Sequence, residues 1–386
     1  MLQEEVMDAD TMDMPAVKPP GRGARRFAES ADAAGAEGSS SVATRPPARR
    51  GWGILATFSP VATAAIALAS HRLVPNLQHA TPTGVYARFL IGVMIVFAAL
   101  GVTQRLWRRV MPSWRNWPVA GASNFLAWCV SSAPLWAAGM IVLCAWELVT
   151  LKWNWMPLPY FPGPDGVLRT LVDDWSSAGL GQPGLAQCMV QSLILLMGGF
   201  VTGSVIGIVC GVLIGWFAPV RYWGMPVMKL IGPIPATALI PMALMLFPNP
   251  TLSAVSLIAM AVWFPVTMLT LSGVSNTRAS YLDVARTLGA GQGYLVLRVA
   301  IPAAMPSIFV GLFMGLGASF LTLIVAEAVG VQAGLGWYID WARAYSDYTK
   351  VYAALVIMAV YFSTIMTVLF KVRDRVLVWQ KGTIKW

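Results

Sequence analysis

Charged side chains are scarce in this sequence. Asp, Glu, Lys and Arg make up 11% of its 386 residues, whereas hydrophobic residues make up 57%. Because soluble domains carry roughly 25% charged residues, the composition excludes an ordinary soluble globular protein. The two histidines and four cysteines form no CxxC pair and no His/Cys cluster. We therefore predict no metal site and no catalytic residues, and we interpret the cysteines as small buried hydrophobes.

A nucleotide-binding P-loop is also missing, because the pattern G-x-x-x-x-G-K-[ST] occurs nowhere in the chain. The net charge is +10, but the basic residues flank apolar segments and do not alternate with aromatic residues on one polar face. This distribution favours orientation signals for membrane insertion over a nucleic-acid surface. We expect a lipid bilayer, and no nucleic acid, among the partners.

Apolar residues fall in runs of about 18 to 30 residues, long enough to cross a hydrocarbon core of ~30 Å. The predicted spans are 53–70, 86–104, 126–150, 187–216, 223–247, 252–274, 304–330 and 351–371. They predict an all-α integral membrane protein with about 8 transmembrane helices. Lys and Arg concentrate in the N-terminal tail and in alternate loops, so we predict that both termini and residues 275–303 are cytoplasmic.

The chain divides into three predicted parts. Residues 1–50 have no hydrophobic period and predict a disordered cytoplasmic tail. Residues 51–125 hold the first two spans and predict an added N-terminal hairpin, and residues 126–386 hold the other spans. After the third span, residues 167–175 place apolar side chains on one helical face. That face suits either an interfacial helix or a helix buried in a soluble lid.

Glycine recurs at every fourth position of the fourth predicted span: Gly199, Gly203, Gly207, Gly211 and Gly215. Each glycine inside a helix costs about 1 kcal/mol relative to Ala, so this row predicts a surface that another helix approaches closely. The seventh span repeats the spacing with Gly311, Gly315 and Ser319. Static packing and helix sliding during transport both account for such surfaces.

Within the fifth predicted span, the stretch IGPIPATALIP (231–241) contains Pro233, Pro235 and Pro241, on either side of Thr237. Each proline removes a backbone donor, and broken backbone at membrane depth survives only when it is buried in protein or lines a watery cavity. We predict that this span forms a wall of a translocation pathway, with a kinked structural helix as the alternative.

Charged residues lie deeper within three of the predicted spans, at Glu147, Lys229 and Glu327. Charges inside a membrane are candidates for function, although Lys229 lies close enough to the inner boundary to extend its ammonium to water. Glu147 and Glu327 lie near outer ends, where water or outer arginines can reach them. For Glu327 the sequence favours a gating role or a structural ion pair over direct contact with substrate.

The segment DVARTLGAGQGYLVLRVAIP, residues 283–302, interrupts the apolar runs. Ser280 is a suitable N-cap, Asp283 suits the first turn of a helix, and Arg286 suits its later part. These residues predict a short helix over 280–288.

Gly289 supplies the conformational freedom that ends this short helix. A second short helix over roughly 291–299 is predicted to return toward the bilayer, where Pro302 starts the seventh span. The predicted result is a compact knob next to the membrane. It suits docking into a cytoplasmic partner, and an ordinary solvated loop is the alternative.

This loop resembles the EAA motif of ABC-importer permeases, in which Glu-Ala-Ala precedes a glycine and Ile-x-Leu-Pro follows at a fixed distance. The matching residues are Asp283-Val284-Ala285, Gly289 and Val299-Ala300-Ile301-Pro302. The chain has Asp for Glu, Val for Ala, Val for Ile and Ile for Leu, and the spacing is intact.

Further segments appear in the order found in the nitrate, sulfonate, taurine and bicarbonate branch of binding-protein-dependent permeases. They are Trp146-Glu147, Phe161-Pro162-Gly163-Pro164, IPATALIP (234–241), ARTLGA (285–290), Ala326-Glu327 and Gly334-Leu335-Gly336. The resemblance covers about residues 130–380. It implies a type I importer permease core of about six helices, to which the N-terminal hairpin is an addition.

The resemblance also implies partners and roles. It implies a permease homodimer in a bacterial inner membrane, two cytoplasmic ABC ATPase subunits that bind ATP and magnesium, and a periplasmic or extracellular substrate-binding protein. No cofactor is expected on this chain. The implied ATPase-coupling residues are Asp283, Val284, Ala285, Arg286, Thr287, Leu288, Gly289, Ala290, Gly291 and Pro302. The implied substrate is a small anion such as a sulfonate, taurine, nitrate or bicarbonate. A secondary transporter or channel without a nucleotide-hydrolysing partner is the alternative.

Overall fold

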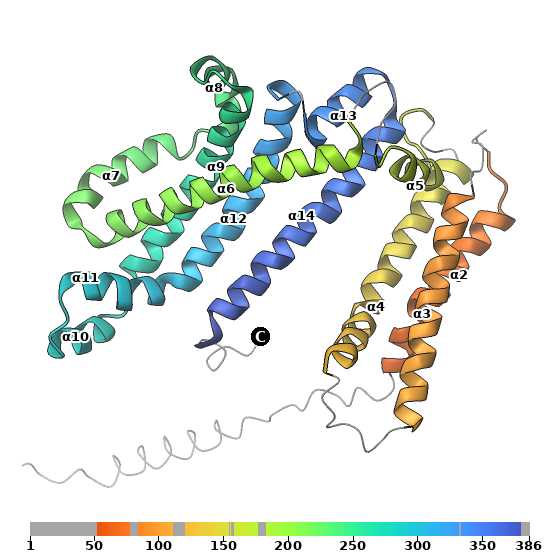
Figure 1. The fold of residues 1–386 in the computed structure, drawn as a ribbon, viewed down its shortest axis with the longest axis horizontal. Helices are drawn as coiled ribbons and strands as arrows, with labels where there is room; N and C mark the ends of the chain where they lie inside the picture. The colour runs from red at the N-terminus through yellow and green to blue at the C-terminus, as the bar shows by residue number, and fades with distance from the viewer. Residues whose placement is uncertain are drawn as a thin grey trace, which may run out of the picture. The chain divides into compact units, whose positions relative to one another are not determined.

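A computed structural model describes residues 52–77, 84–110, 120–153, 155, 158–176, 183–331 and 333–379. The predicted tail, residues 1–50, lies outside the described residues. The chain divides after Ala56, and all contacts given below lie within the unit Thr57–Trp386. Its regular elements are helices (Figure 1), which confirms the all-α prediction.

The helices differ widely in length. In chain order they are α2 (Trp52–Leu73), α3 (Val85–Val110), α4 (Ala120–Glu147), the π-helical turn η1 (Leu148–Lys152), α5 (Pro164–Asp173), α6 (Leu185–Trp216), α7 (Ala218–Ile231), the 3₁₀ turn η2 (Ala236–Leu239), α8 (Ile240–Leu246), α9 (Pro250–Ser275), α10 (Ala279–Thr287), α11 (Gln292–Tyr294), the π-helical segment η3 (Leu295–Ala300), α12 (Ile301–Val329), α13 (Leu335–Ala344) and α14 (Tyr348–Val376).

Most of the predicted spans correspond to helices that are long and apolar enough to cross a membrane. Among the described residues these are Val85–Thr103, Ser132–Lys152, Leu185–Trp216, Pro250–Ser275, Gln292–Val329 and Tyr348–Val376, and the bent pair α7 and α8 is a further candidate. The first predicted span, 53–70, falls in α2, whose described part is not among these candidates. The multi-spanning helical architecture is therefore as predicted.

Helix α9 lies between the two glycine rows. A Cβ atom added at Gly211 of α6 would lie 2.5 Å from Cβ of Thr270 and 2.7 Å from the carbonyl oxygen of Thr267, both on α9. On the other side, a Cβ at Gly311 of α12 would lie 3.1 Å from Cα of Val266. Both rows thus let a neighbouring helix approach closely, which confirms the prediction from their spacing.

Alanine at position 211 is expected to destabilise the fold by about 1–3 kcal/mol, because the new methyl group would overlap backbone atoms that cannot move aside. The matched control is Gly198→Ala on the same helix, where the nearest atom, Cγ2 of Val255, lies at an ordinary 3.6 Å. The control is expected to be neutral or stabilising by up to about 1 kcal/mol. Unfolding of the purified variants in detergent measures both, and equal stabilities would contradict the packing assignment.

The fifth predicted span is broken, as its prolines predict. Helix α7 ends at Ile231, and α7 and the following helical segment meet at an angle of 80°. Pro233 and Pro235 lie in the break, where their missing N–H groups interrupt no helix. Pro241 lies in the first turn of α8, a position that needs no N–H donor.

The seventh span begins earlier than predicted. Residues 292–300 are helical, as predicted for 291–299, but the helical backbone continues without a break from Gln292 to Val329, so this helix is not separate from the span. The segment η3 has wider π-helical turns and comes directly before Pro302, the second residue of α12. Wider turns accommodate a proline ring that would clash with a carbonyl in a regular α-helix. Pro302 therefore lies within a long helix and does not start one.

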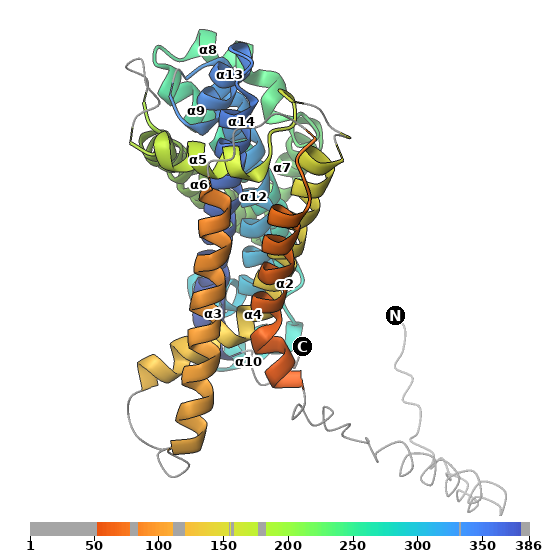
Figure 2. The same cartoon turned by 90° about the vertical axis from the view of Figure 1, so that its right-hand side faces the viewer.

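Helices α2, α3 and α4 pack around a small apolar cluster. Its buried members are Ala64 and Ala67 of α2, Tyr86 and Leu90 of α3, and Met140 of α4. Figure 2 shows α2 and α3 side by side, with α4 next to them. The predicted N-terminal hairpin thus packs directly on the first helix of the remaining chain.

Helix α5 places its apolar side chains in two environments. Val167 is buried in a cluster with Tyr338 of α13 and Ala353 of α14. Val172 and Trp175, which share the predicted apolar face, are exposed. One end of this face is therefore covered by protein, and the other remains accessible.

Candidate functional site

Helix α10 follows α9 and precedes α11 in the chain, and it lies at one end of the bundle, next to α11 (Figure 1). None of its residues is buried. Val284 is 61% exposed, and Leu288, directly after the helix, is 82% exposed. Large apolar side chains with such exposure mark a contact surface when they cluster.

The termini of α10 are set by its backbone. The N-cap residue is Arg278, which makes no side-chain capping bond, so the prediction of Ser280 as N-cap is wrong. At the other end Gly289 has a φ of 82°. The N–H of Gly289 donates to the carbonyl of Arg286 (2.9 Å), and the N–H of Ala290 donates to the carbonyl of Ala285 (3.0 Å). These two bonds form a Schellman motif, which confirms that Gly289 ends the helix.

The polar side chains of α10 satisfy one another locally. Nη1 of Arg286 lies 3.1 Å from Oδ1 of Asp283, and both side chains are exposed. The hydroxyl of Thr287 donates to the carbonyl of Val284. Exposed pairs three residues apart contribute only about 0.2–0.5 kcal/mol, so these residues shape the surface of α10 more than they stabilise it.

The predicted pathway residues do not form one hydrogen-bonded cluster in the described part of the chain. Lys229 is exposed in the last turn of α7. Thr237 lies half-buried in η2, between Pro235 and α8. Ser319 of α12 is buried, and its hydroxyl donates to the carbonyl of Leu316 on its own helix. Between α7 and η2, the broken span has non-helical backbone, which is the feature it adds to the predicted pathway.

Glu327 is fully buried at the end of α12. The hydroxyl of Ser192 on α6 donates to its Oε1 (2.6 Å), and the N–H of Gly336 on α13 donates to its Oε2 (2.8 Å). The N–H of Leu335 donates in turn to Oγ of Ser192 (2.9 Å). Among the described residues no cation pairs with Glu327. The sequence predicts water, an arginine or an ion pair at this carboxylate, whereas its partners are a hydroxyl group and a backbone N–H. The carboxylate instead joins α6, α12 and α13.

The glycines at the start of α13 leave room for this carboxylate. A Cβ atom at Gly334, whose φ is 97°, would lie 2.8 Å from Oε2 of Glu327. A Cβ at Gly336 would lie 2.9 Å from Cβ of the same residue. Gly334-Leu335-Gly336 therefore forms a close-fitting turn around Glu327.

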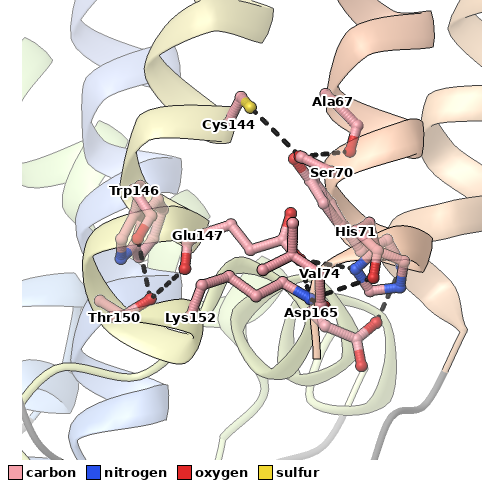
Figure 3. Close-up of polar contacts among 11 residues, drawn as sticks. Ala67, Ser70, His71, Val74, Cys144, Trp146, Glu147, Thr150, Lys152 and Asp165 are labelled. Carbon is pink, nitrogen blue, oxygen red and sulfur yellow. Dashed lines mark hydrogen bonds and ion pairs between the residues drawn. The ribbon is translucent and has the colours of Figure 1, made fainter. Parts of the chain in front are cut away.

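A second buried carboxylate, Glu147, lies where α4 meets α2 (Figure 3). Its Oε1 lies 2.6 Å from Nδ1 of His71 and 3.9 Å from Nζ of Lys152. The ammonium of Lys152 also donates to the carbonyl oxygens of His71 and Val74. The expectation that water or arginines reach Glu147 is wrong, because the residue is fully buried and its partners are a histidine and a lysine.

Neighbouring hydrogen bonds extend this junction. The backbone N–H of Tyr86 donates to Oδ1 of the buried Asp165 (2.9 Å), which joins α3 to α5.

Another hydrogen bond joins α13 to the end of α5. The phenol of Tyr338 on α13 donates to Asp174, just after α5 (2.8 Å). Burial, and then the hydrogen bond to Asp174, raises the pKa of Tyr338 well above its ordinary value. The phenol therefore remains a donor at neutral pH.

In the part of the chain that the structure describes, these features define a multi-spanning helical membrane protein with a broken span and an exposed helical loop. The family model described as "Binding-protein-dependent transport system inner membrane component" matches residues 203–377. The probable ABC transporter permease protein of Brucella abortus (strain 2308) is 31% identical over 221 residues, which are 57% of this chain and 86% of that protein. The chain therefore belongs to this family of ABC-importer permeases, and the resemblance found in the sequence is confirmed.

Two further proteins are similar to this chain. The taurine transport system permease protein of Escherichia coli (strain K12) is 29% identical over 220 residues, covering 57% of this chain and 80% of that protein. An inward-facing structure of the MetNI methionine ABC transporter aligns with a TM-score of 0.45 and 18% identity, covering 50% of this chain and 95% of the other.

Proposed function

We propose that this chain is the permease subunit of an ATP-driven importer and forms the translocation pathway for a small sulfonate-like solute. Two copies pair in a bacterial inner membrane, with both termini in the cytoplasm. Two ATPase subunits bind ATP and magnesium on the cytoplasmic side, and a substrate-binding protein delivers the solute from outside. The chain itself carries out no chemical reaction.

The exposed α10 loop is the observation that carries this proposal. Its conformation is fixed by the Schellman motif at Gly289, whereas its apolar residues Val284 and Leu288 remain uncovered. A rigid helix with an exposed apolar tip fits a groove in a partner protein, because little conformational freedom is lost on docking. We assign Asp283 to Gly291 to this contact, and Pro302 to the helix that carries its motion into the bundle.

The broken span and the buried α12 residues are the proposed pathway elements. Non-helical backbone at membrane depth requires a protein or water environment, and the pathway supplies it between α7 and α8. The proposed lining and gating residues are Lys229, Pro233, Pro235, Thr237, Pro241, Ser319 and Glu327. Because Glu327 joins three helices through hydrogen bonds, we assign it to the gate and not to the substrate.

ATP acts through the relative stability of two states. A ligand shifts a conformational equilibrium only by its differential affinity for the states. In this proposal ATP-bound, closed ATPase subunits favour the outward-facing permease through α10, and hydrolysis restores the inward-facing state.

The substrate assignment is an analogy with the taurine transport system permease protein of Escherichia coli. It is tested by uptake of labelled taurine into liposomes that contain this chain, its ATPase and ATP, with the binding protein added outside. We expect uptake only when all components are present. Transport by the chain alone would support the alternative of a secondary transporter or channel. Uptake of nitrate or bicarbonate but not taurine would contradict only the substrate assignment and would leave the proposed ATP-driven import in place.

A further inference from the structure

One face of α3 lines an apolar groove that the proposed transport mechanism does not use. The groove, here called the α3 groove, is lined by Phe89, Gly92, Val93, Val96, Phe97 and Leu100 of α3 and by Ser132 and Trp136 of α4. Its volume is about 380 Å³, within the range of roughly 300–1,000 Å³ found for ligand sites. A Cβ atom at Gly92 would meet no atom within 4 Å, so the groove is open there.

A second hollow lies next to the α3 groove along α3. This hollow, here called the arginine pocket, has a volume of about 710 Å³ and is lined by Val85, Arg88 and Phe89 of α3 and by Arg169, Val172 and Asp173 of α5. Phe89 lines both hollows. On α3, Phe89 lies one turn after Val85 and one turn before Val93, so the two hollows are neighbours along this helix.

The arginine pocket has a net positive charge. Arg169 pairs with Asp173 at 3.1 Å, and both side chains remain more than half exposed. Arg88 donates from Nε to the carbonyl of Gly84 (3.3 Å), and its Nη groups make no hydrogen bond within the described residues. Two guanidinium groups against one carboxylate leave a surplus positive charge. Guanidinium groups are well suited to bind phosphate oxygens in pairs.

The dimensions match one leaflet of a membrane. From Val85 to Leu100 the helix rises by about 22 Å at 1.5 Å per residue. Half of a ~30 Å hydrocarbon core plus one headgroup layer is about 20–22 Å. The apolar groove therefore spans roughly the depth of an acyl chain, and the arginines lie at the level of the headgroup.

We propose that the α3 groove and the arginine pocket together bind one anionic glycerophospholipid. An acyl chain lies along α3 past Gly92, and the phosphate contacts Arg88 and Arg169. The polarity of the surface favours this occupant over a second copy of the chain, because positive charge is confined to one end and apolar side chains fill the rest. A lipid bridging α3, α4 and α5 holds the N-terminal hairpin against the permease.

The test uses the purified full chain and phosphatidylglycerol with a photoreactive group on its acyl chain. We expect adducts in peptides covering 89–100 and 132–136, and we expect unlabelled phosphatidylglycerol to compete with them better than phosphatidylethanolamine. At about 1 kcal/mol for each arginine near anionic lipid, the double variant Arg88→Gln/Arg169→Gln lowers labelling roughly 30-fold. Gly92→Leu, which fills the groove, is expected to abolish the acyl-chain adducts.

Matched variants show whether these effects are local. Gly317→Leu places the same side chain at an open position of α12, and Arg343→Gln removes an exposed paired arginine of α13. Both are expected to label like the unchanged chain. Equal competition by phosphatidylethanolamine would overturn the assignment to an anionic lipid. Adducts outside the two peptides would show that the acyl chain does not bind in the α3 groove. Disulfides between two chains carrying Val96→Cys, without lipid adducts, would show that a second copy occupies it.

Discussion

Valine in place of Gly289 is expected to lower ATP-driven uptake roughly tenfold or more, within the 5–150-fold range of typical coupling free energies. At a φ of 82°, a β-branched residue is strained by about 1–3 kcal/mol. The last turn of α10 then rearranges, and Val284 and Leu288 lose their positions. The measurement compares substrate uptake with ATP hydrolysis in liposomes containing the ATPase.

The control for this prediction is Gly293→Val. Gly293 is also exposed, a Cβ atom there would meet no atom within 4 Å, and its φ is not positive. We expect the control to transport normally. A second variant, Leu288→Asp, leaves the backbone unchanged and adds charge to a side chain that is 82% exposed. If both Gly289→Val and Leu288→Asp retain full uptake at normal expression, α10 is not the docking element.

Local chain chemistry explains why so much of the fold could be predicted. The length of an apolar run determines whether a helix crosses the bilayer, and proline and glycine act within one or two turns of their own position. The break near Pro233, the close approach at Gly211 and the helix end at Gly289 are all effects of this kind. Each was readable from a short stretch of sequence.

Local rules were less reliable at two helix ends. Ser280 has the composition of an N-cap, but α10 begins at Ala279, and the exposed first turn needs no side-chain cap because water can satisfy its N–H groups. Pro302 has the composition of a helix start, but η3 continues the helix through it. Proline disfavours a regular α-helix before it, and a π-helical segment avoids that restriction.

The partners of the buried carboxylates could not be predicted, because they lie far apart in the sequence. Ser192 and Glu327 are 135 residues apart, and His71 and Glu147 are 76 residues apart. Neither Ser192 in an apolar helix nor a lone His71 beside a polar loop carries a local signal. Only the tertiary packing of α6 on α12, and of α2 on α4, brings these side chains together.

The junction at Glu147 leads to the second large expected effect. Replacing Glu147 by glutamine is expected to lower the free energy of unfolding by about 3–5 kcal/mol, because it leaves the buried ammonium of Lys152 without its counter-charge. Lys152 is only 2% exposed, so water cannot take over that role. Detergent unfolding measures the loss. Labelling of Cys144, whose Sγ lies 3.4 Å from Oγ of Ser70 on α2, reports locally whether α2 has moved away from α4.

If removing both charges restores stability, then the stability lost in Glu147→Gln is due to the unpaired charge of Lys152 and not to a change in the shape of the site. The double variant Glu147→Gln/Lys152→Met is therefore expected to be more stable than Glu147→Gln alone, since replacing both members of a buried pair is often close to neutral. Asp340→Asn, which breaks an exposed pair with Arg343, is expected to cost less than about 1 kcal/mol. A double variant less stable than the single one would mean that Lys152 holds His71 and Val74 through its hydrogen bonds to their carbonyls alone. The hairpin would then depend on those bonds and not on the ion pair.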